Sequence, residues 1–268
     1  MASKFVVITG ASSGIGEATA KRYGASGARV AVLSRNAGRL AAVAEQIRRA
    51  GGDVTPYTVD LSNSRATEEI AARISRELGA PDILINNAGA GRWLPMTETT
   101  ADEALAMIEV PYLAGFTLTR AFLPAMLARR SGSIAFITSP ASYVAWPRAS
   151  AYIAARRAVA GLAESLQSEH KGTGLVVSLV VLGEVKTPYW EHNPGGRDNM
   201  PKIDSRLLPV LTPDEAASAI VEGIDAKRPF VAKPALLRAF FVLNALFPRL
   251  VARQLRRATG KPSARTQP

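Results

Sequence analysis

The chain of 268 residues contains no cysteine and only two histidines, His170 and His192. Disulfides and thiolate metal sites are therefore excluded, and two imidazoles cannot build a site of several histidines. We predict no metal site. A chain without cysteine fits a reducing compartment, and we expect a cytoplasmic location.

Long apolar segments are also missing from the sequence. No segment reaches the ~18 uninterrupted apolar residues that a membrane span requires. The first apolar segment, Phe5–Ile8, is short and directly follows Met1-Ala2-Ser3-Lys4. We expect it to form a strand rather than a secretory leader.

Acidic residues are missing from the last part of the chain. The whole sequence has 33 Lys and Arg against 22 Asp and Glu, a net charge of +11, yet no acid occurs from Ala226 to the end. We expect this basic tail to be either solvated or in contact with a membrane surface. We do not expect nucleic-acid binding, because no aromatic-interleaved basic module or zinc knuckle accompanies the charge.

Short apolar segments alternate with segments of helical periodicity along the chain. This alternation predicts a doubly wound α/β fold, with parallel strands joined by right-handed crossover helices in three layers. The strands are almost uniformly apolar, as is typical of strands buried on both faces. We predict one domain over residues 1–268. The expected strands are 5–9, 28–34, 54–59, 82–86, 133–138 and 175–181, and the expected helices lie near 15–25, 37–50, 64–79, 101–129 and 150–170.

Residues 187–211 interrupt the alternation, with few periodic apolar positions. The segment contains Pro188, Pro194, Gly195, Gly196, Pro201 and Pro209. Long loops inside compact domains are usually functional, and we predict a lid here. Thr212-Pro213-Asp214-Glu215 then restarts a helix, because Thr212 and Glu215 can form a capping box around a proline in the first turn.

A glycine-rich loop follows the first expected strand and opens the first helix, in the sequence Thr9-Gly10-Ala11-Ser12-Ser13-Gly14-Ile15-Gly16. Glycines allow the backbone to approach a pyrophosphate closely, and the helix N-terminus offers free N–H groups and the positive end of a dipole. The strand–loop–helix context makes this motif specific for a nicotinamide dinucleotide.

The end of the second expected strand, Val32-Leu33-Ser34-Arg35, predicts which dinucleotide is bound. A site that prefers NAD(H) places a carboxylate here for the adenine ribose. Ser34 and Arg35 suit a 2′-phosphate instead, so we predict a preference for NADP(H) over NAD(H). Asp60-Leu61 close the third strand, where Asp60 either accepts a hydrogen bond from the adenine amine or caps a helix.

Together with this loop, Asn86-Asn87-Ala88-Gly89 and the spacing of Ser139 and Tyr152 resemble the motifs of the short-chain dehydrogenase/reductase family from Val6 to about Pro188. The resemblance implies a seven-stranded parallel sheet of order 3-2-1-4-5-6-7, hydride transfer at nicotinamide, and a homo-dimer or homo-tetramer built on helices. The residues it assigns to cofactor binding are Gly10, Ser12, Ser13, Gly14, Ile15, Gly16, Ser34, Arg35, Asp60, Leu61, Asn87, Ala88, Gly89, Tyr152, Arg156, Gly183, Val185 and Thr187.

The catalytic assignment follows from the needs of carbonyl reduction, which are a hydride donor, a proton donor at the oxygen and a group that polarises this oxygen. Tyr152 begins a helix, and Ser139 ends the preceding strand, so the two can meet at the carboxyl edge of the sheet. Tyr152 would be the general acid in reduction and, as phenolate, the base in oxidation. Ser139 would hold the substrate oxygen.

The sequence departs from the family pattern at three positions. Arg156 stands where the family has lysine, and it keeps the positive charge but does not release a proton. Pro111 stands where the family usually has the asparagine that helps to hold a relay water, and Leu182-Gly183 replaces the usual Pro-Gly. Arg156 shares a helix face with Tyr152, whereas Arg157 points away.

The segments Arg92–Pro95, Tyr143–Trp146 and Pro188–Trp190 contain all three tryptophans and are expected around the pocket. They predict an apolar carbonyl or alcohol substrate, with loop packing as the alternative. Within a basic C-terminal extension, about 234–268, the apolar segment 235–247 is expected to cap the pocket or to be buried in a dimer, with interfacial membrane docking as the alternative.

Three functions are consistent with these residues. The first is an NADP(H)-dependent oxidoreductase with an atypical active site. The second is a catalytically impaired dinucleotide-binding protein that acts as a sensor or partner subunit. The third is an enzyme that catalyses a non-redox reaction on the same fold.

Overall fold

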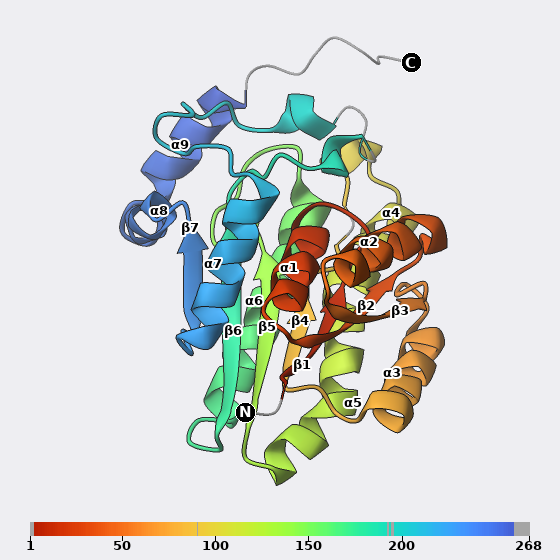
Figure 1. Ribbon diagram of the computed structural model, residues 1–268. Helices are drawn as coiled ribbons and strands as arrows, with labels where there is room; N and C mark the ends of the chain where they lie inside the picture. The colour runs from red at the N-terminus through yellow and green to blue at the C-terminus, as the bar shows by residue number, and fades with distance from the viewer. Residues whose placement is uncertain (1–2, 90, 192, 194–195, 260–268) are drawn as a thin grey trace.

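A seven-stranded parallel sheet forms the centre of the molecule in the computed structural model (Figure 1). The structure describes residues 3–89, 91–191, 193 and 196–259. The order β3-β2-β1-β4-β5-β6-β7 confirms the order that the resemblance implied. Every neighbouring pair is parallel. The strands are β1 (Phe5–Thr9), β2 (Arg29–Ser34), β3 (Asp53–Thr58), β4 (Ile83–Asn86), β5 (Gly132–Thr138), β6 (Leu175–Leu182) and β7 (Phe230–Lys233).

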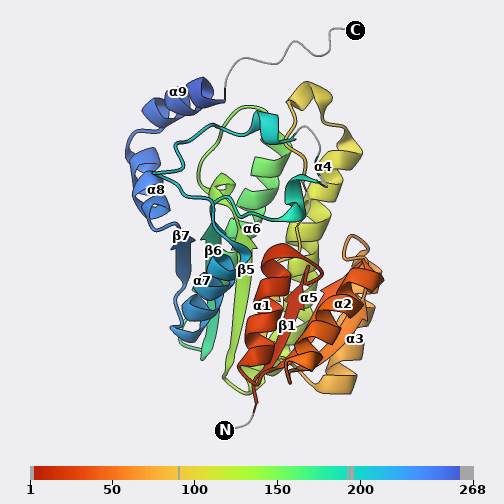
Figure 2. The same ribbon diagram turned by 45° about the horizontal axis from the view of Figure 1, so that its top comes forward.

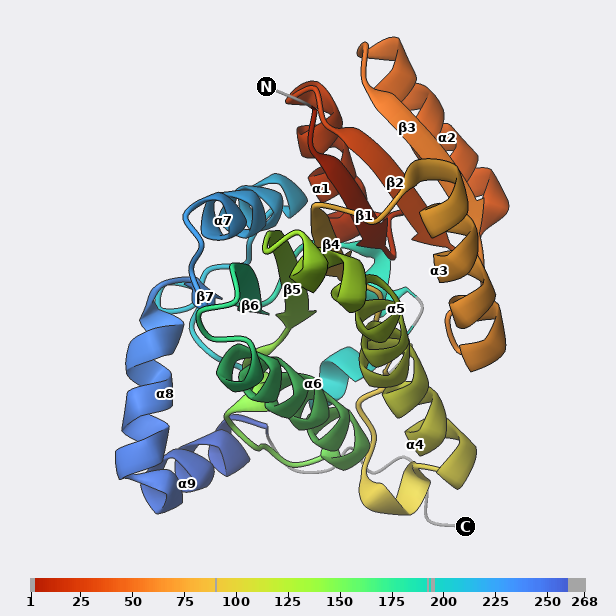
Figure 3. The same ribbon diagram turned by 90° about the horizontal axis from the view of Figure 1, so that it is seen from below.

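Helices cover both faces of the sheet, which gives the predicted three layers (Figures 1 and 3). On one face lie α1 (Gly14–Ala25), α2 (Ala37–Arg49) and α7 (Pro213–Asp225). On the other lie α3 (Ser64–Leu78), α5 (Ala114–Ala128) and α6 (Ser150–Glu169). Each face has its own core cluster of buried apolar side chains, because alternate residues of each strand point to opposite faces.

The segment 101–129 is not the continuous helix that its periodicity predicts. It consists of α4 (Ala101–Ile108), a π-helical turn over Glu109–Leu113, and α5. Pro111 lies buried in the middle of this turn. Proline has no N–H to continue an α-helical ladder, and a single π turn is one way for a helix to accommodate such an interruption.

The expected lid is a loop whose two ends lie side by side. Lys186 N donates to Leu211 O and Leu211 N donates to Glu184 O, both at 2.8 Å. Between these ends lie two 3-10 turns, η4 (Pro188–Trp190) and η5 (Gly196–Asn199); residues 192 and 194–195 lie outside the described part. The predicted capping box between Thr212 and Glu215 is confirmed and starts α7 directly after the loop.

The C-terminal extension forms two helices beside β7, namely α8 (Leu236–Leu246) and α9 (Pro248–Ala258). Figure 2 shows them at the same end of the molecule as the lid. Residues 260–268 of the extension lie outside the described part. Among the helices formed by the described residues, none is long and apolar enough to cross a membrane.

Candidate active site

A cavity of about 1060 Å³ lies at the carboxyl edge of the sheet. Its walls come from the loops that follow β1, β2, β4, β5 and β6, together with the lid and one side of α8 and α9. The chain order reverses between β1 and β4, and this switch point is where doubly wound sheets bind ligands.

The glycines of the first loop are required by the packing of the chain on itself. A Cβ on Gly10, where φ is +67°, would lie 2.9 Å from Ala88 Cα, and a Cβ on Gly16 would lie 2.3 Å from Gly10 O. The glycines that allow a pyrophosphate to approach also have a role within the chain. These two glycines pack the loop against the end of β4, so contacts within the protein position the loop.

The contact between the glycine loop and the end of β4 also fixes the loop that follows β4. Thr9 Oγ1 accepts hydrogen bonds from Asn87 N and Ala88 N, both at 2.9 Å, and Asn87 Nδ2 donates to Thr9 O at 2.9 Å. Ser13 is the N-cap of α1, but its side chain makes no capping hydrogen bond. The first turn of α1 therefore presents its backbone N–H groups to the cavity, as an anion site requires.

Two arginines line the cavity where the chain leaves β2 and enters α2. Arg35 lines it as predicted, and Arg39, on the first turn of α2, lines it as well. Ser34 Oγ donates to Ser12 Oγ at 2.8 Å and so joins the end of β2 to the glycine loop. Sequence reasoning missed Arg39, although its position four residues after Arg35 could have indicated it.

Asp60 and Leu61 also line the cavity. Asp60 Oδ1 accepts from Ser62 N at 3.1 Å and from Ser62 Oγ at 2.9 Å, and these bonds hold the pKa of the carboxyl below its usual value. The alternative reading of Asp60 as a helix N-cap is wrong, because Asn63 caps α3 by accepting from Ala66 N. Asp60 thus stays ionised and fixes the turn at the edge of the cavity.

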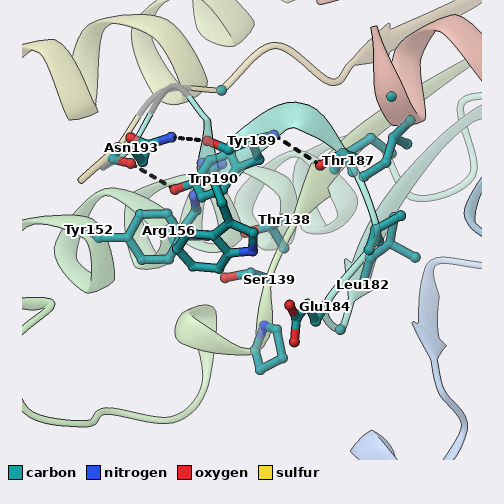
Figure 4. A pocket seen from close by; sticks show the side chains of 18 of the residues that line it. Thr138, Ser139, Tyr152, Arg156, Leu182, Glu184, Thr187, Tyr189, Trp190 and Asn193 are labelled. Atoms are coloured by element: carbon teal, nitrogen blue, oxygen red, sulfur yellow. Dashed lines mark hydrogen bonds between the residues drawn. The ribbon is translucent and has the colours of Figure 1, made fainter. Parts of the chain in front are cut away.

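Ser139 and Tyr152 reach the same cavity from β5 and α6 (Figure 4). Ser139 follows β5 and its Oγ accepts from Ala141 N at 3.2 Å. Ser142 joins the two elements, since its Oγ lies 2.8 Å from Thr138 Oγ1 and donates to Arg156 O at 2.9 Å. The strand end and the helix that carry the candidate catalytic pair are therefore held together by hydrogen bonds.

Arg156 is buried and its guanidinium lies over the ring of Tyr152, with Cζ 4.8 Å from the ring centre. It also lies close to the loop after β4, since a Cβ on Gly89 would lie 2.9 Å from Arg156 Nη2. The guanidinium is thus near both the Tyr152 ring and Gly89. Arg157, by contrast, is exposed to solvent, as helix geometry predicts.

Aromatic side chains line the part of the cavity beside Tyr152. The Trp93 ring centre lies 5.1 Å from those of Trp146 and Tyr152 and 5.3 Å from that of Trp190. The three segments that hold the tryptophans, distant in sequence, therefore meet beside Tyr152. The space next to its phenol ring is lined mainly by aromatic faces, which suit an apolar ligand.

The predicted lid, 187–211, contacts this aromatic cluster through hydrogen bonds. Tyr189 Oη donates to Gly91 O at 2.8 Å and accepts from Trp93 Nε1 at 3.3 Å. Burial raises the pKa of Tyr189 above its ordinary value, so the hydroxyl keeps its proton over the range in which proteins are studied. Asn199 Nδ2 adds a bond to Trp93 O at 2.7 Å.

Glu184 is a cavity residue that sequence reasoning missed, although it lies between the assigned Gly183 and Val185. Its carboxylate forms an ion pair with Arg197 of the lid, with Nη2 and Oε1 3.4 Å apart. Gly183, Val185 and Thr187 line the cavity around it. The contact joins the lid to the segment that follows β6.

The lining of the cavity suits a nicotinamide dinucleotide. A helix N-terminus without a side-chain cap lies at its centre, two arginines and two serine hydroxyls lie at one end, and the Ser139 and Tyr152 pair lies at the other. Of the residues assigned to the cofactor, Gly16 alone is absent from the cavity wall, because it packs behind the loop.

Comparison with known proteins identifies the family. The model of the short chain dehydrogenase family matches residues 4–196. A short chain dehydrogenase of Pseudocercospora fijiensis is 35% identical over 69% of this chain, and the match spans 60% of that relative's length. An uncharacterized oxidoreductase of Mycobacterium bovis is 33% identical over 95% of this chain and 73% of its own length.

A solved structure extends the likeness to three dimensions. A short-chain dehydrogenase from Sphingobium yanoikuyae in complex with NADPH superposes with a TM-score of 0.79, at 26% identity, over 98% of both chains. The family match, the sheet order and the cavity that the glycine loop shares with Ser139 and Tyr152 all indicate the same family. The chain therefore belongs to the short chain dehydrogenase family and is a nicotinamide dinucleotide-dependent oxidoreductase of that family.

Proposed function

We propose that the chain is an NADP(H)-dependent oxidoreductase that interconverts an apolar ketone or aldehyde and its alcohol. The observation that carries the proposal is that Ser139, Tyr152 and Arg156 line the same cavity as the glycine loop and Arg35. The aromatic wall beside Tyr152 supports an apolar substrate.

The preference for NADP(H) rests on Arg35 and Arg39. In the pose that we propose, the 2′-phosphate lies between these guanidinium groups and Ser34, and the pyrophosphate lies at the N-terminus of α1. The end of β2 carries no carboxylate, and the acidic side chain nearby, Asp60 after β3, is already bonded to Ser62. The NADPH complex of the Sphingobium yanoikuyae relative supports this choice.

Each side chain of the pair has one task in the mechanism. The cofactor, when bound, supplies the hydride that reduces the carbonyl carbon. Ser139 Oγ donates a hydrogen bond to the carbonyl oxygen and positions it, and Tyr152 Oη donates the proton to this oxygen. Arg156, fixed 4.8 Å from the ring centre, stabilises the negative charge that remains on the phenol.

The return of a proton to Tyr152 must differ from that in relatives with lysine and asparagine. Pro111 has neither an N–H nor a side-chain donor, and the Arg156 guanidinium does not release a proton. We propose that water in the cavity reprotonates the phenolate directly. The same two residues motivate the second candidate, a protein that binds NADP(H) without turnover.

Consumption of NADPH with a panel of apolar ketones and aldehydes tests the proposal. We expect turnover by the wild type, and Tyr152→Phe should lower kcat by about 10²–10⁴-fold because it removes the proton donor. NADPH affinity should fall far less than kcat, because phenylalanine keeps the ring that packs against Arg156. The matched control is Tyr57→Phe, since Tyr57 lies on β3 and donates to Glu77 outside the cavity. Unchanged turnover in Tyr152→Phe would refute the mechanism.

A further inference from the structure

The helices α8 and α9 form an angled pair at the periphery of the molecule (Figure 3), here called the C-terminal hairpin, Leu236–Ala258. Its turn is unusually apolar for a surface. Leu246 is 67% exposed, Phe247 54% and Leu250 50%. Val242 and Leu243, one turn earlier on α8, are exposed as well.

The opposite side of the hairpin is fixed to the body of the protein. Leu237 and Phe240 of α8 and Leu255 of α9 line the active-site cavity. Val251 and Leu255 are buried in a cluster with Val144. Asn244 Nδ2 donates to Tyr143 O at 3.1 Å. The hairpin is therefore a built part of the fold, and its exposed apolar side chains are held in a defined position.

Four arginines flank the exposed turn. Arg249, Arg253, Arg256 and Arg257 lie at helical spacing on α9 and are all exposed, on the side opposite Val251 and Leu255. Among the described residues none of the four forms an ion pair. The sequence has no acidic residue from Ala226 onwards, so the hairpin offers positive charge and apolar surface together.

A second copy of this chain would cover such a surface poorly. In a twofold contact the same patch meets itself, which would bring the arginines of both copies together with no carboxylate from either hairpin. An anionic lipid surface satisfies both features, because headgroups pair with the arginines while the apolar turn enters the boundary with the acyl chains.

We propose that the C-terminal hairpin docks the protein on a membrane that contains anionic lipids. Leu246, Phe247 and Leu250 enter the interface, and the four arginines of α9 lie at the headgroups. Since Leu237, Phe240 and Leu255 on the inner side line the cavity, docking places the cavity beside the apolar phase. The delivery of an apolar substrate by this route rests on the proposed function, whereas the docking itself does not.

The absence of cysteine allows a direct test on the whole chain. Leu246→Cys provides a single thiol for an environment-sensitive fluorophore, and Leu105→Cys on α4, 55% exposed in the native chain, is the matched control. Vesicles of phosphatidylcholine mixed with phosphatidylserine should shift the emission of the label at position 246 to the blue and leave the label at position 105 unchanged. Vesicles of phosphatidylcholine alone should have little effect.

Vesicle co-sedimentation of unlabelled variants separates the two contributions. Arg249→Gln with Arg253→Gln should weaken binding about 25-fold, from about fivefold for each basic residue at an anionic surface. Phe247→Ser should weaken it about tenfold or more through lost apolar burial. The control pair Arg22→Gln with Arg76→Gln removes the same charge from exposed sites on α1 and α3 and should change binding little.

NADPH affinity and turnover with a water-soluble ketone are measured on the same variants without vesicles. They should not change, so failure of docking and failure of the proposed function are told apart. Equal effects of the control pair and the hairpin pair would overturn the proposal, as would a label at position 246 that ignores anionic vesicles. A change from dimer to monomer in Phe247→Ser without vesicle binding would assign the hairpin to a second copy instead.

Discussion

At the scale of single residues, the site is defined by where its cations lie. Arg156 is buried close to the Tyr152 ring and Gly89, and Arg35 and Arg39 line the part of the cavity after β2. Sequence spacing predicted Arg156 and Arg35, because each occupies a motif position. It missed Arg39 and Glu184, since neither is itself a motif position, although each lies close in sequence to residues that are.

Two substitutions separate the electrostatic role of Arg156 from its packing role. Arg156→Met keeps much of the buried volume but removes the cation, and kcat should fall by about 10²-fold, as for loss of one preorganised electrostatic contact. Arg156→Lys should retain most of the activity because it keeps the charge. The measurement is kcat from NADPH consumption, with NADPH affinity measured by fluorescence. A methionine variant as active as the wild type would mean that the guanidinium has only a packing role.

Arg35, after β2, and Arg39, on the first turn of α2, predict how the coenzymes are distinguished. Arg35→Gln and Arg39→Gln should each weaken NADPH binding by about tenfold or more, since a charge-assisted hydrogen bond to the 2′-phosphate is lost. NADH affinity should change little. Titration of both coenzymes against both variants checks this, with Arg22→Gln as the control. Equal losses for NADH and NADPH would show that these residues do not read the 2′-phosphate.

At the scale of elements, two segments determine the shape of the site, the lid and the interrupted helix. The loop over 187–211 was expected from its prolines and glycines, and its role as a lid stays a prediction. Its contacts could not be predicted, because Tyr189 is distant in sequence from Gly91 and Trp93. Helical periodicity predicted one helix over 101–129. The π turn around Pro111 could be anticipated only as a kink, since its geometry depends on how α4 and α5 pack.

The Tyr189 hydroxyl predicts how firmly the lid closes. Tyr189→Phe leaves Gly91 O without its donor and Trp93 Nε1 without its acceptor, at a cost of about 1–3 kcal/mol to the closed lid. KM for the carbonyl substrate should rise, and NADPH affinity should not change. Because burial raises the pKa of Tyr189, the rise in KM should be the same from neutral to mildly alkaline pH. A KM difference that vanishes as the pH rises would show that the hydroxyl ionises and is not the lid's donor.

At the scale of the whole molecule, the fold followed from the sequence more completely than the site did. Six apolar segments of strand length predicted six of the seven strands. The seventh, β7, has only four residues between Pro229 and Pro234, too few for a pattern, and it was expected from the family resemblance alone. The segment 235–247 is apolar nearly all round, yet in the structure Leu237 alone is buried among the residues of α8.

Transfer of deuterium tests the central claim most directly, namely that one cavity holds the coenzyme, Ser139, Tyr152 and an apolar carbonyl together. The experiment uses NADPH that carries deuterium at the transferring position of the nicotinamide, and mass spectrometry of the alcohol product. The account predicts that the wild type forms alcohol that carries deuterium. Tyr152→Phe should form almost no alcohol. Tight NADPH binding with no labelled alcohol from any ketone, or a product formed without label, would contradict it.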